Sequence, residues 1–294
     1  MHTYFSQWQI DRYISLLNDT NKHARADAAE RMGSVEDRQV IEPLIKALAD
    51  VYEPVKQHAC LSLGIILRQN RFDRVAEVLV LPNNEEIVKI ILVKSNQVQA
   101  NKHNTTNLAL VTVEEREVII EKILPLLTAH NPQTRQKAAL SLAKLGTNNA
   151  ISFLLEGLTD PNENVIEACI FALGEIGYAE TNYSKEITYS LLPFLQHSSV
   201  PVRINTINAI IKNANEKLSF ELLTKMLADE DIYVRLEIIS GLGFIGDIRA
   251  LPILEQILRS DSRKDEYDNT IYRAAQEAIA EIQWRNQNLS LQKQ

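Results

Sequence analysis

The stretch DEDIYVRLEIISGLGFIG, which runs from Asp229 to Gly246, decides the fold. A basic residue, Arg235, stands six positions after the opening acid. Apolar residues then follow it at three, four and seven positions. Because an α-helix repeats every 3.6 residues, this spacing places those residues on one helix face. The closing glycine predicts a helix end in the left-handed conformation.

The same phrase recurs along the chain with a period of a little over thirty residues. We call the basic position of each copy the slot. The slots are Arg25, Lys56, Lys89, Arg135, Ile166, Arg203 and Arg235, with a weaker copy around Arg273. A second apolar run precedes most slots, as in VIEPLIKALA before Lys56 and LPILEQIL before Arg273. We therefore predict an all-α fold with no sheet, a right-handed α-solenoid (superhelix) of about eight helical hairpins.

The repeats predict one solenoid domain over residues 1–294, with recognisable copies from about 7 to 284. A segment rich in Asn, Gln and Thr, about 95–114, is interpreted as an insertion loop, either functional or neutral. Asn96 stands seven residues after the Lys89 slot, where other copies are apolar, so the third copy is predicted to be the weakest link. The tail at about 286–294 is expected to fray.

Turn residues and helix breakers add expectations about local structure. Turn acids or amides stand six positions before five slots and are expected to cap the second helices. They are Asp19, Asp50, Asn83, Asp160 and Asp229. Left-handed glycines are expected to close second helices at Gly33, Gly146, Gly177 and Gly246. Pro125 and Pro193 fall inside first helices and are expected to bend them.

The turn acid followed by Val-Arg, the alanine-rich second helix and the Leu-Gly-x-Ile-Gly ending are best preserved at 160–177 and 229–246. With these features the chain resembles the HEAT-repeat family, and more narrowly the HEAT-like repeats of phycobilisome lyases. The resemblance implies HEAT-like hairpins and a structural ladder of acids and bases between neighbouring repeats. It pairs Asp19 with Arg25, Asp50 with Lys56, and Asp229 with Arg235. The remaining ladder residues are Arg135, Asp160 and Arg203, and Ile166 interrupts the series.

No catalytic residue, metal site or cofactor is predicted. The six histidines show no His-x-x-x-His or His-Glu pair, and there is no Cys-x-x-Cys. Deoxyhypusine hydroxylases, built from similar repeats, hold iron with His-Glu pairs, which this sequence lacks. Cys60 and Cys169 stand where other copies carry Ala or Ile, so we interpret them as packing residues rather than nucleophiles.

Composition and charge argue against several kinds of binding partner and cellular location. With 31 Lys and Arg against 38 Asp and Glu, the net charge of -7 argues against nucleic-acid binding. No stretch of about 18 apolar residues predicts a membrane span, and the N-terminus does not resemble a signal peptide. Two cysteines favour a reducing compartment, so a cytoplasmic location is expected.

Some apolar second-helix positions lie off the predicted buried face: Leu61, Leu140, Phe171 and Phe244. In a HEAT solenoid they would line the concave side as a binding strip, or they would pack between second helices. The first hypothesis is a non-enzymatic scaffold that binds one or more proteins. The alternative, implied by the resemblance, is a bilin lyase or chromophore-handling chaperone acting with a linear tetrapyrrole on a phycobiliprotein. The sequence leaves the partner and any activity open.

Overall fold

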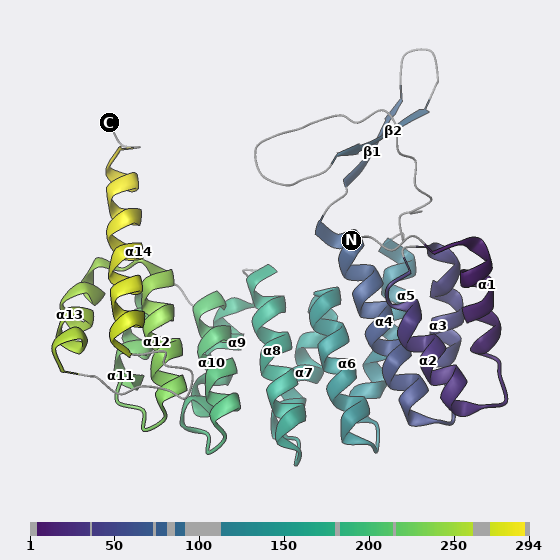
Figure 1. Cartoon of the computed structure of the whole chain (residues 1–294), viewed down its shortest axis with the longest axis horizontal. Helices are drawn as coiled ribbons and strands as arrows, with labels where there is room; N and C mark the ends of the chain where they lie inside the picture. The colour runs from purple at the N-terminus through teal and green to yellow at the C-terminus, as the bar shows by residue number, and fades with distance from the viewer. Residues whose placement is uncertain are drawn as a thin grey trace. The chain divides into compact units, whose positions relative to one another are not determined.

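The computed structural model describes residues 5–35, 37–72, 75–80, 86–91, 113–179, 183–213, 216–260 and 271–291. The chain divides into two compact units, an N-terminal unit of residues 1–153 and a C-terminal unit of residues 154–294. Helices dominate both units, and they pack as sequential pairs along the chain (Figure 1). Within the described residues this gives seven helical pairs, so the all-α prediction is confirmed.

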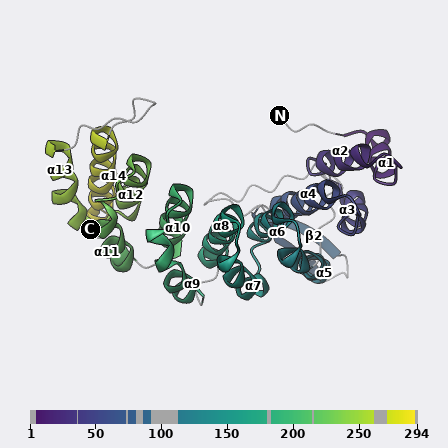
Figure 2. The ribbon, with the colours of Figure 1, turned by 90° about the horizontal axis from the view of Figure 1, so that it is seen from below.

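Three pairs form the N-terminal unit. They are α1 (Gln7–Leu16) with α2 (Lys22–Met32), α3 (Ile41–Ala47) with α4 (Glu53–Phe72), and α5 (Val113–Ile123) with α6 (Pro132–Leu145). In Figure 2 the second helices α2, α4 and α6 lie in one row and the first helices in another. Direct contacts join α2 to α4 and α4 to α6, so the second helices of this unit form a continuous layer.

Four pairs form the C-terminal unit, and the first begins at the division between the units. They are α7 (Ile151–Glu156) with α8 (Glu163–Ala179), α9 (Ser184–Leu191) with α10 (Val200–Asn213), α11 (Glu216–Met226) with α12 (Ile232–Ile245), and α13 (Leu251–Ser260) with α14 (Ile271–Leu291). The second helices again contact one another in sequence, α8 with α10, α10 with α12 and α12 with α14. In each unit we call this row the second-helix layer.

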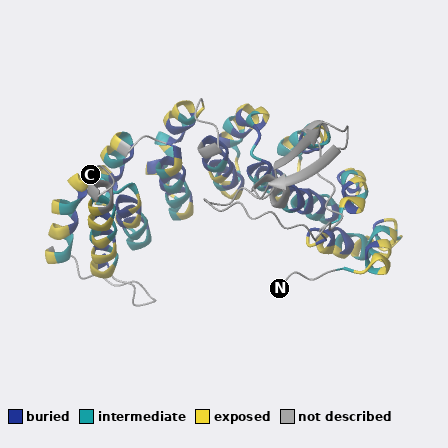
Figure 3. Cartoon of the chain, turned by 90° about the horizontal axis from the view of Figure 1, so that it is seen from above, coloured by how far each residue is buried: buried dark blue, intermediate teal, exposed yellow. Residues whose placement is uncertain are grey.

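The hydrophobic core lies between the two layers. Side chains three, four and seven positions after the slot are buried in the copies where the sequence predicts it, for example Ile238, Ile239 and Leu242. Figure 3 shows buried residues gathered where helices face each other, with exposed residues on the outer sides. The predicted apolar face of the second helices is therefore confirmed.

Neighbouring second helices approach so closely that they need small residues. Eight positions after the slot, Gly33 and Gly64 each lie against a serine of the next second helix, Ser62 and Ser141. A Cβ atom on Gly64 would lie 2.6 Å from the Ser141 Oγ and 3.0 Å from its Cα. The Ser141 hydroxyl donates to the Cys60 carbonyl at 2.8 Å, so these polar side chains serve the helix contact itself.

Residues 75–91 overturn the expectation that the chain has no sheet. Strands β1 (Val75–Val80) and β2 (Glu86–Ile91) pair antiparallel, with Val75 opposite Ile91. The predicted slot Lys89 therefore lies in β2 and not in a helix. Both segments are rich in Val and Ile, which favour strands, and short apolar runs do not distinguish strand from helix by periodicity.

The strands belong to an insertion and not to a third helical repeat. Residues 73–112 fall between α4 and α5, yet α4 packs directly on α6. The sequence-based prediction of a weak third unit between them does not hold, because the layer continues across the insertion. Asn96 and most of the predicted 95–114 loop lie outside the described residues, and α5 already begins at Val113.

Some helix ends differ from the sequence expectations. Gly146 and Gly246 end helices with φ of 58° and 77°, as predicted. Gly33 has a φ of -61°, and Gly177 lies inside α8. Both are needed for close packing instead, because a Cβ on Gly177 would lie 1.9 Å from the Asn213 Oδ1. The left-handed assignment of these two glycines was therefore wrong.

Pro125 and Pro193 end their α-helices instead of bending them. The chain continues as 3-10 turns at Leu124–Thr128 and Leu192–Gln196, with each proline near the start of the turn. Proline has no N–H to donate to the preceding turn, which explains the change.

At the C-terminus, α14 runs to Leu291, into the tail that was expected to fray from about 286. The Asn286 Nδ2 donates to the Ile282 carbonyl at 2.8 Å and to the Gly246 carbonyl at 3.3 Å, which holds this turn against the end of α12. Among the described helices, none is long and apolar enough to cross a membrane.

Replacing Gly64 by Ala tests the direct contact of α4 with α6. We expect the variant to lose about 1–3 kcal/mol of unfolding free energy through overpacking, although alanine favours a helix over glycine by about 1 kcal/mol. Urea denaturation measures this. A cycle with Ser141→Gly should show that the two substitutions are coupled. An unchanged or more stable Gly64→Ala protein would contradict the close contact.

Candidate functional site

The turn acids form turns but do not cap the second helices themselves. Each accepts the backbone N–H two residues later, as in Asp50 with Tyr52 at 2.8 Å and Asp229 with Asp231 at 2.9 Å. The cap of the following helix is the residue two positions on, for example Asn21 for α2 and Asp231 for α12. The predicted capping role therefore belongs to the second polar residue of the turn.

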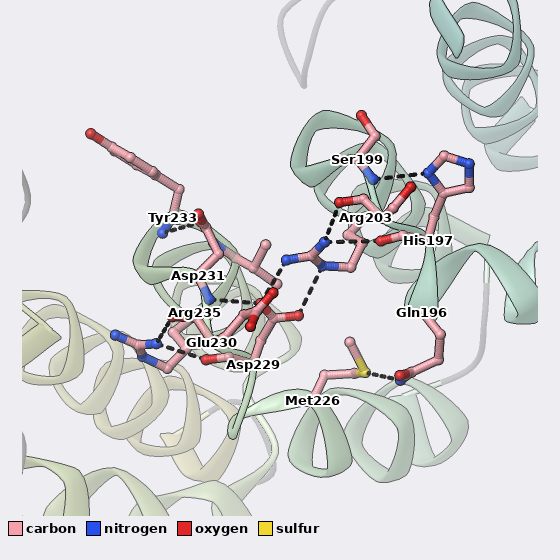
Figure 4. A network of polar contacts seen from close by, with 12 residues as sticks. Gln196, His197, Ser199, Arg203, Met226, Asp229, Glu230, Asp231, Tyr233 and Arg235 are labelled. Carbon is pink, nitrogen blue, oxygen red and sulfur yellow. Dashed lines mark hydrogen bonds and ion pairs between the residues drawn. The ribbon is translucent and has the colours of Figure 1, made fainter. Parts of the chain in front are cut away.

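Arg203 in α10 shows the contact that joins neighbouring repeats (Figure 4). Its Nε and Nη2 donate to the two carboxylate oxygens of Asp229 in the next turn, both at 2.9 Å. Its Nη1 donates to the carbonyls of His197 and Ser198 in its own turn, at 2.9 and 3.1 Å. Only 7% and 8% of the Arg203 and Asp229 side chains are exposed. One guanidinium therefore fixes two successive turns.

Arg25 in α2 repeats this geometry. Its Nε and Nη2 donate to the Asp50 carboxylate at 2.7 and 3.0 Å, and its Nη1 donates to the Asp19 carbonyl at 2.9 Å. The resemblance implied a pair of Arg25 with Asp19. The structure places the carboxylate partner one repeat later and gives Arg25 only the Asp19 backbone.

Arg135 and Arg235 also donate their Nη1 to the carbonyls of their own turns. Arg135 reaches Ala129 at 2.8 Å, and Arg235 reaches Asp229 at 2.7 Å. The predicted Asp229 and Arg235 pair is therefore a contact with the Asp229 backbone, since its carboxylate binds Arg203. In its own turn Asp160 accepts the Asn162 N–H at 2.9 Å.

Lys56 does not pair directly with Asp50 as predicted. Its Nζ donates to Glu53 in the same helix at 2.7 Å, and the other Glu53 oxygen accepts from the Thr134 hydroxyl of α6 at 2.5 Å. These two hydrogen bonds lower the pKa of Glu53. Lysine has a shorter side chain than arginine and a single nitrogen that donates. It therefore binds one nearby carboxylate, whereas arginine can bridge two turns.

The interruption at Ile166 extends to the following turn. Ile166 is buried and brings no guanidinium, and the next turn carries His197 at the position that is acidic in four other turns, Asp19, Asp50, Asp160 and Asp229. The His197 Nδ1 accepts the Ser199 N–H at 3.1 Å, so the turn keeps its local hydrogen bond without a carboxylate. Loss of the arginine and loss of the acid therefore occur at the same step.

The chemistry of these residues is structural. The Arg25 guanidinium is the main cause that lowers the pKa of Asp50. Burial raises the pKa of the Cys60 thiol to about 12, which leaves it without thiolate at neutral pH. Cys169 is also buried. The described residues contain no group of three or more His, Cys, Asp or Glu side chains that could hold a metal ion.

The second-helix layer of the C-terminal unit exposes several aromatic rings, and the two predicted phenylalanines are among them. Phe171 on α8 is 37% exposed and Phe244 on α12 is 58% exposed. A cation from the next second helix lies over each ring, the Lys212 Nζ 5.8 Å from the Phe171 centroid and the Arg285 guanidinium 5.3 Å from that of Phe244. In the N-terminal unit the predicted Leu61 and Leu140 are only partly buried.

Sequence reasoning did not predict what holds these rings. Lys212 also pairs with Glu175 on α8, and Arg285 pairs with Glu281 at 2.8 Å and donates to the Phe244 carbonyl. Phe171 stands five positions after its slot and Lys212 nine after the next one. Comparing these two positions in successive copies would have revealed the contact, because they face the same side of the layer.

Comparison with known proteins agrees with this geometry. The family model for HEAT repeats matches residues 114–182 and 188–281, more than half of the chain. The chain belongs to the HEAT-repeat family. A model for the PBS lyase HEAT-like repeat also matches residues 24–50. No curated protein sequence matches the chain.

Solved structures resemble this chain at low sequence identity, and such a likeness supports the fold alone. The CpcE and CpcF complex of phycocyanin lyase from Nostoc sp. PCC7120 aligns with a TM-score of 0.52, 19% identity, and coverage of 96% of this chain and 97% of that chain. The Escherichia coli protein YIBA aligns with a TM-score of 0.56 and 19% identity, and the alignment covers 94% of this chain and 82% of that chain. A mutant of Kap121p aligns with a TM-score of 0.60 and 13% identity, and the alignment covers 84% of this chain but only 24% of that chain.

Replacing Asp50 by Asn tests the contact between turns. Asparagine keeps an oxygen for the Tyr52 N–H but removes the charge that Arg25 binds. We expect a loss of about 1.5–3 kcal/mol of unfolding free energy at neutral pH. Because the folded pKa of Asp50 is lowered, its contribution is complete above about pH 4 and is lost as pH falls through the folded pKa. The difference from wild type should therefore shrink below pH 4.

The matched control is Asp27→Asn, whose ion pair with Arg31 is exposed at 51% and 57% of the two side chains. This variant should lose no more than about 0.5 kcal/mol. Denaturation curves at several pH values distinguish the two sites. Equal losses in both variants would contradict a special role for the Asp50 contact.

Proposed function

We propose that the chain is a non-enzymatic protein-binding scaffold, and that the second-helix layer of the C-terminal unit contacts the partner. The observation that carries this proposal is the exposure of Phe171 and Phe244 on one layer of a HEAT-repeat protein. Large aromatic side chains contribute strongly to binding when a partner covers them. Exposed aromatic rings lower the solubility of a protein. A partner that covers these two rings would explain their presence, whereas the packing of the repeats does not.

Packing between the repeats does not explain why phenylalanine stands at these two positions. Stacking of the second helices uses glycine, alanine and serine, for example Gly174 against Ala209 and Gly243 against Ala278. The turn contacts use arginine and carbonyl groups at the helix starts. Phe171 and Phe244 take part in neither, and the cations over their rings restrain them before a partner arrives, which lowers the entropic cost of binding.

Replacing both Phe171 and Phe244 by Ser should abolish binding of the partner and shift the unfolding free energy by no more than about 1 kcal/mol, because both rings are partly exposed. Co-purification from the native host with mass spectrometry, combined with thermal melts, measures both effects. A loss of about 3–5 kcal/mol would instead show core residues and contradict the proposal.

Tyr189 on the first helix α9 offers a matched control. It is 53% exposed, and the Lys185 Nζ lies 6.0 Å from its ring centroid, so it resembles the two phenylalanines but belongs to the other layer. Tyr189→Ser should retain the partner. Loss of the same proteins in this variant would mean that exposed aromatics in general, and not the second-helix layer, cause the retention.

The alternative function is a bilin lyase or chromophore-handling chaperone. The PBS lyase HEAT-like match at residues 24–50 and the likeness to phycocyanin lyase favour it. If it holds, the chain should increase covalent attachment of a linear tetrapyrrole to an apo-phycobiliprotein, measured by mass spectrometry of the acceptor. Attachment at the same rate with and without the chain would exclude the lyase but leave the scaffold proposal intact.

A further inference from the structure

We infer that the partner of the C-terminal unit presents a basic amphipathic segment. Its apolar side chains would contact Phe171 and Phe244, and its Lys or Arg side chains would pair with Glu167 and Glu237. This inference rests on the proposed scaffold function, since both use the same face. It adds the chemical class of the partner.

Each exposed ring has a glutamate on the same side of its own helix. Glu167 stands four residues before Phe171 on α8, and Glu237 stands seven residues before Phe244 on α12. Residues four or seven apart lie one above the other on a helix surface. The helix between them, α10, contributes the uncharged Asn205 to the same layer. The face therefore carries a carboxylate and a ring on each of two second helices, about one turn apart on α8 and about two turns apart on α12.

Three cations on this layer already have carboxylate partners. Lys212 pairs with Glu175, Arg285 with Glu281, and Arg273 with Glu277. In the part of the chain that the structure describes, neither Glu167 nor Glu237 takes part in an ion pair, although Glu167 accepts a hydrogen bond from Asn205 at 2.9 Å. Both glutamates are partly exposed. The uncompensated charge of the face is therefore negative.

The net charge of the whole C-terminal unit is also negative. Residues 154–294 contain 13 Lys and Arg against 21 Asp and Glu, whereas residues 1–153 contain 18 against 17. The net negative charge of the protein thus belongs to the C-terminal unit. Such a unit attracts a basic segment at long range and repels an acidic protein or a nucleic acid. Charge complementarity selects the basic partner among those with a suitable apolar face.

The test uses two synthetic amphipathic helical peptides with the same leucine face, one with Lys and one with Glu on the polar face. Fluorescence anisotropy at low salt should show the Lys peptide binding at least tenfold more tightly to the full chain, with affinity falling as salt rises. In the Glu167→Gln and Glu237→Gln double variant, affinity for the Lys peptide should fall about fivefold. Glutamine keeps an acceptor for Asn205, so the loss reports charge.

Matched controls are Glu186→Gln and Glu255→Gln, two exposed glutamates on the first helices α9 and α13 of the same unit. This pair should bind the Lys peptide as wild type does. Equal affinity for both peptides, or equal losses in both double variants, would overturn the inference. If the phenylalanine variant loses the native partner while Glu167→Gln with Glu237→Gln retains it fully, the scaffold function stands and the basic partner is wrong.

Discussion

Close approach of neighbouring second helices is the constraint on which each unit depends. Even a Cβ atom is too close where Gly64 meets Ser141 or where Gly174 meets Ala209, since it would lie 2.6 Å from the Ser141 Oγ and 2.9 Å from the Ala209 Cβ. This contact assigns the faces of every second helix. One side packs on the neighbouring second helices, and another packs on the first helices and forms the core. The remaining side takes part in neither contact. Function can change on that side without disturbing the stack.

The arginine contacts set how successive turns lie in the two places where the structure describes them completely. Arg25 and Arg203 each join the backbone of one turn to the carboxylate of the next. The bidentate fork fixes orientation as well as distance, which a lysine does not achieve. At Ile166 and His197 both halves of the contact are missing, and these repeats are joined by helix packing and by polar contacts between α8 and α10, such as that of Asn205 with Glu167.

The sequence predicted what periodicity determines. Apolar residues at three, four and seven positions identified the buried face, because a helix turns by a fixed angle. The resemblance implied the pair of Arg25 with Asp19, and the Asp19 carbonyl does accept from Arg25, but the carboxylate that binds this guanidinium is Asp50 of the next repeat, which spacing within one copy does not reveal. Residues 75–91 were assigned to a repeat because a short apolar run fits helix and strand alike. Contacts between repeats are nonlocal, and a single sequence does not display them.

The exposure of Phe171 and Phe244 follows from the same geometry. Phe171 and Phe244 stand five and nine positions after their slots, off the buried face of the helix, so the fold leaves both aromatic side chains partly exposed. The cation above each ring belongs to the next repeat, and it is in turn held by a carboxylate, Glu175 or Glu281. Stacking of the repeats therefore does more than support the surface. It orders the aromatic side chains in advance, and the two glutamates beside them give that surface its sign.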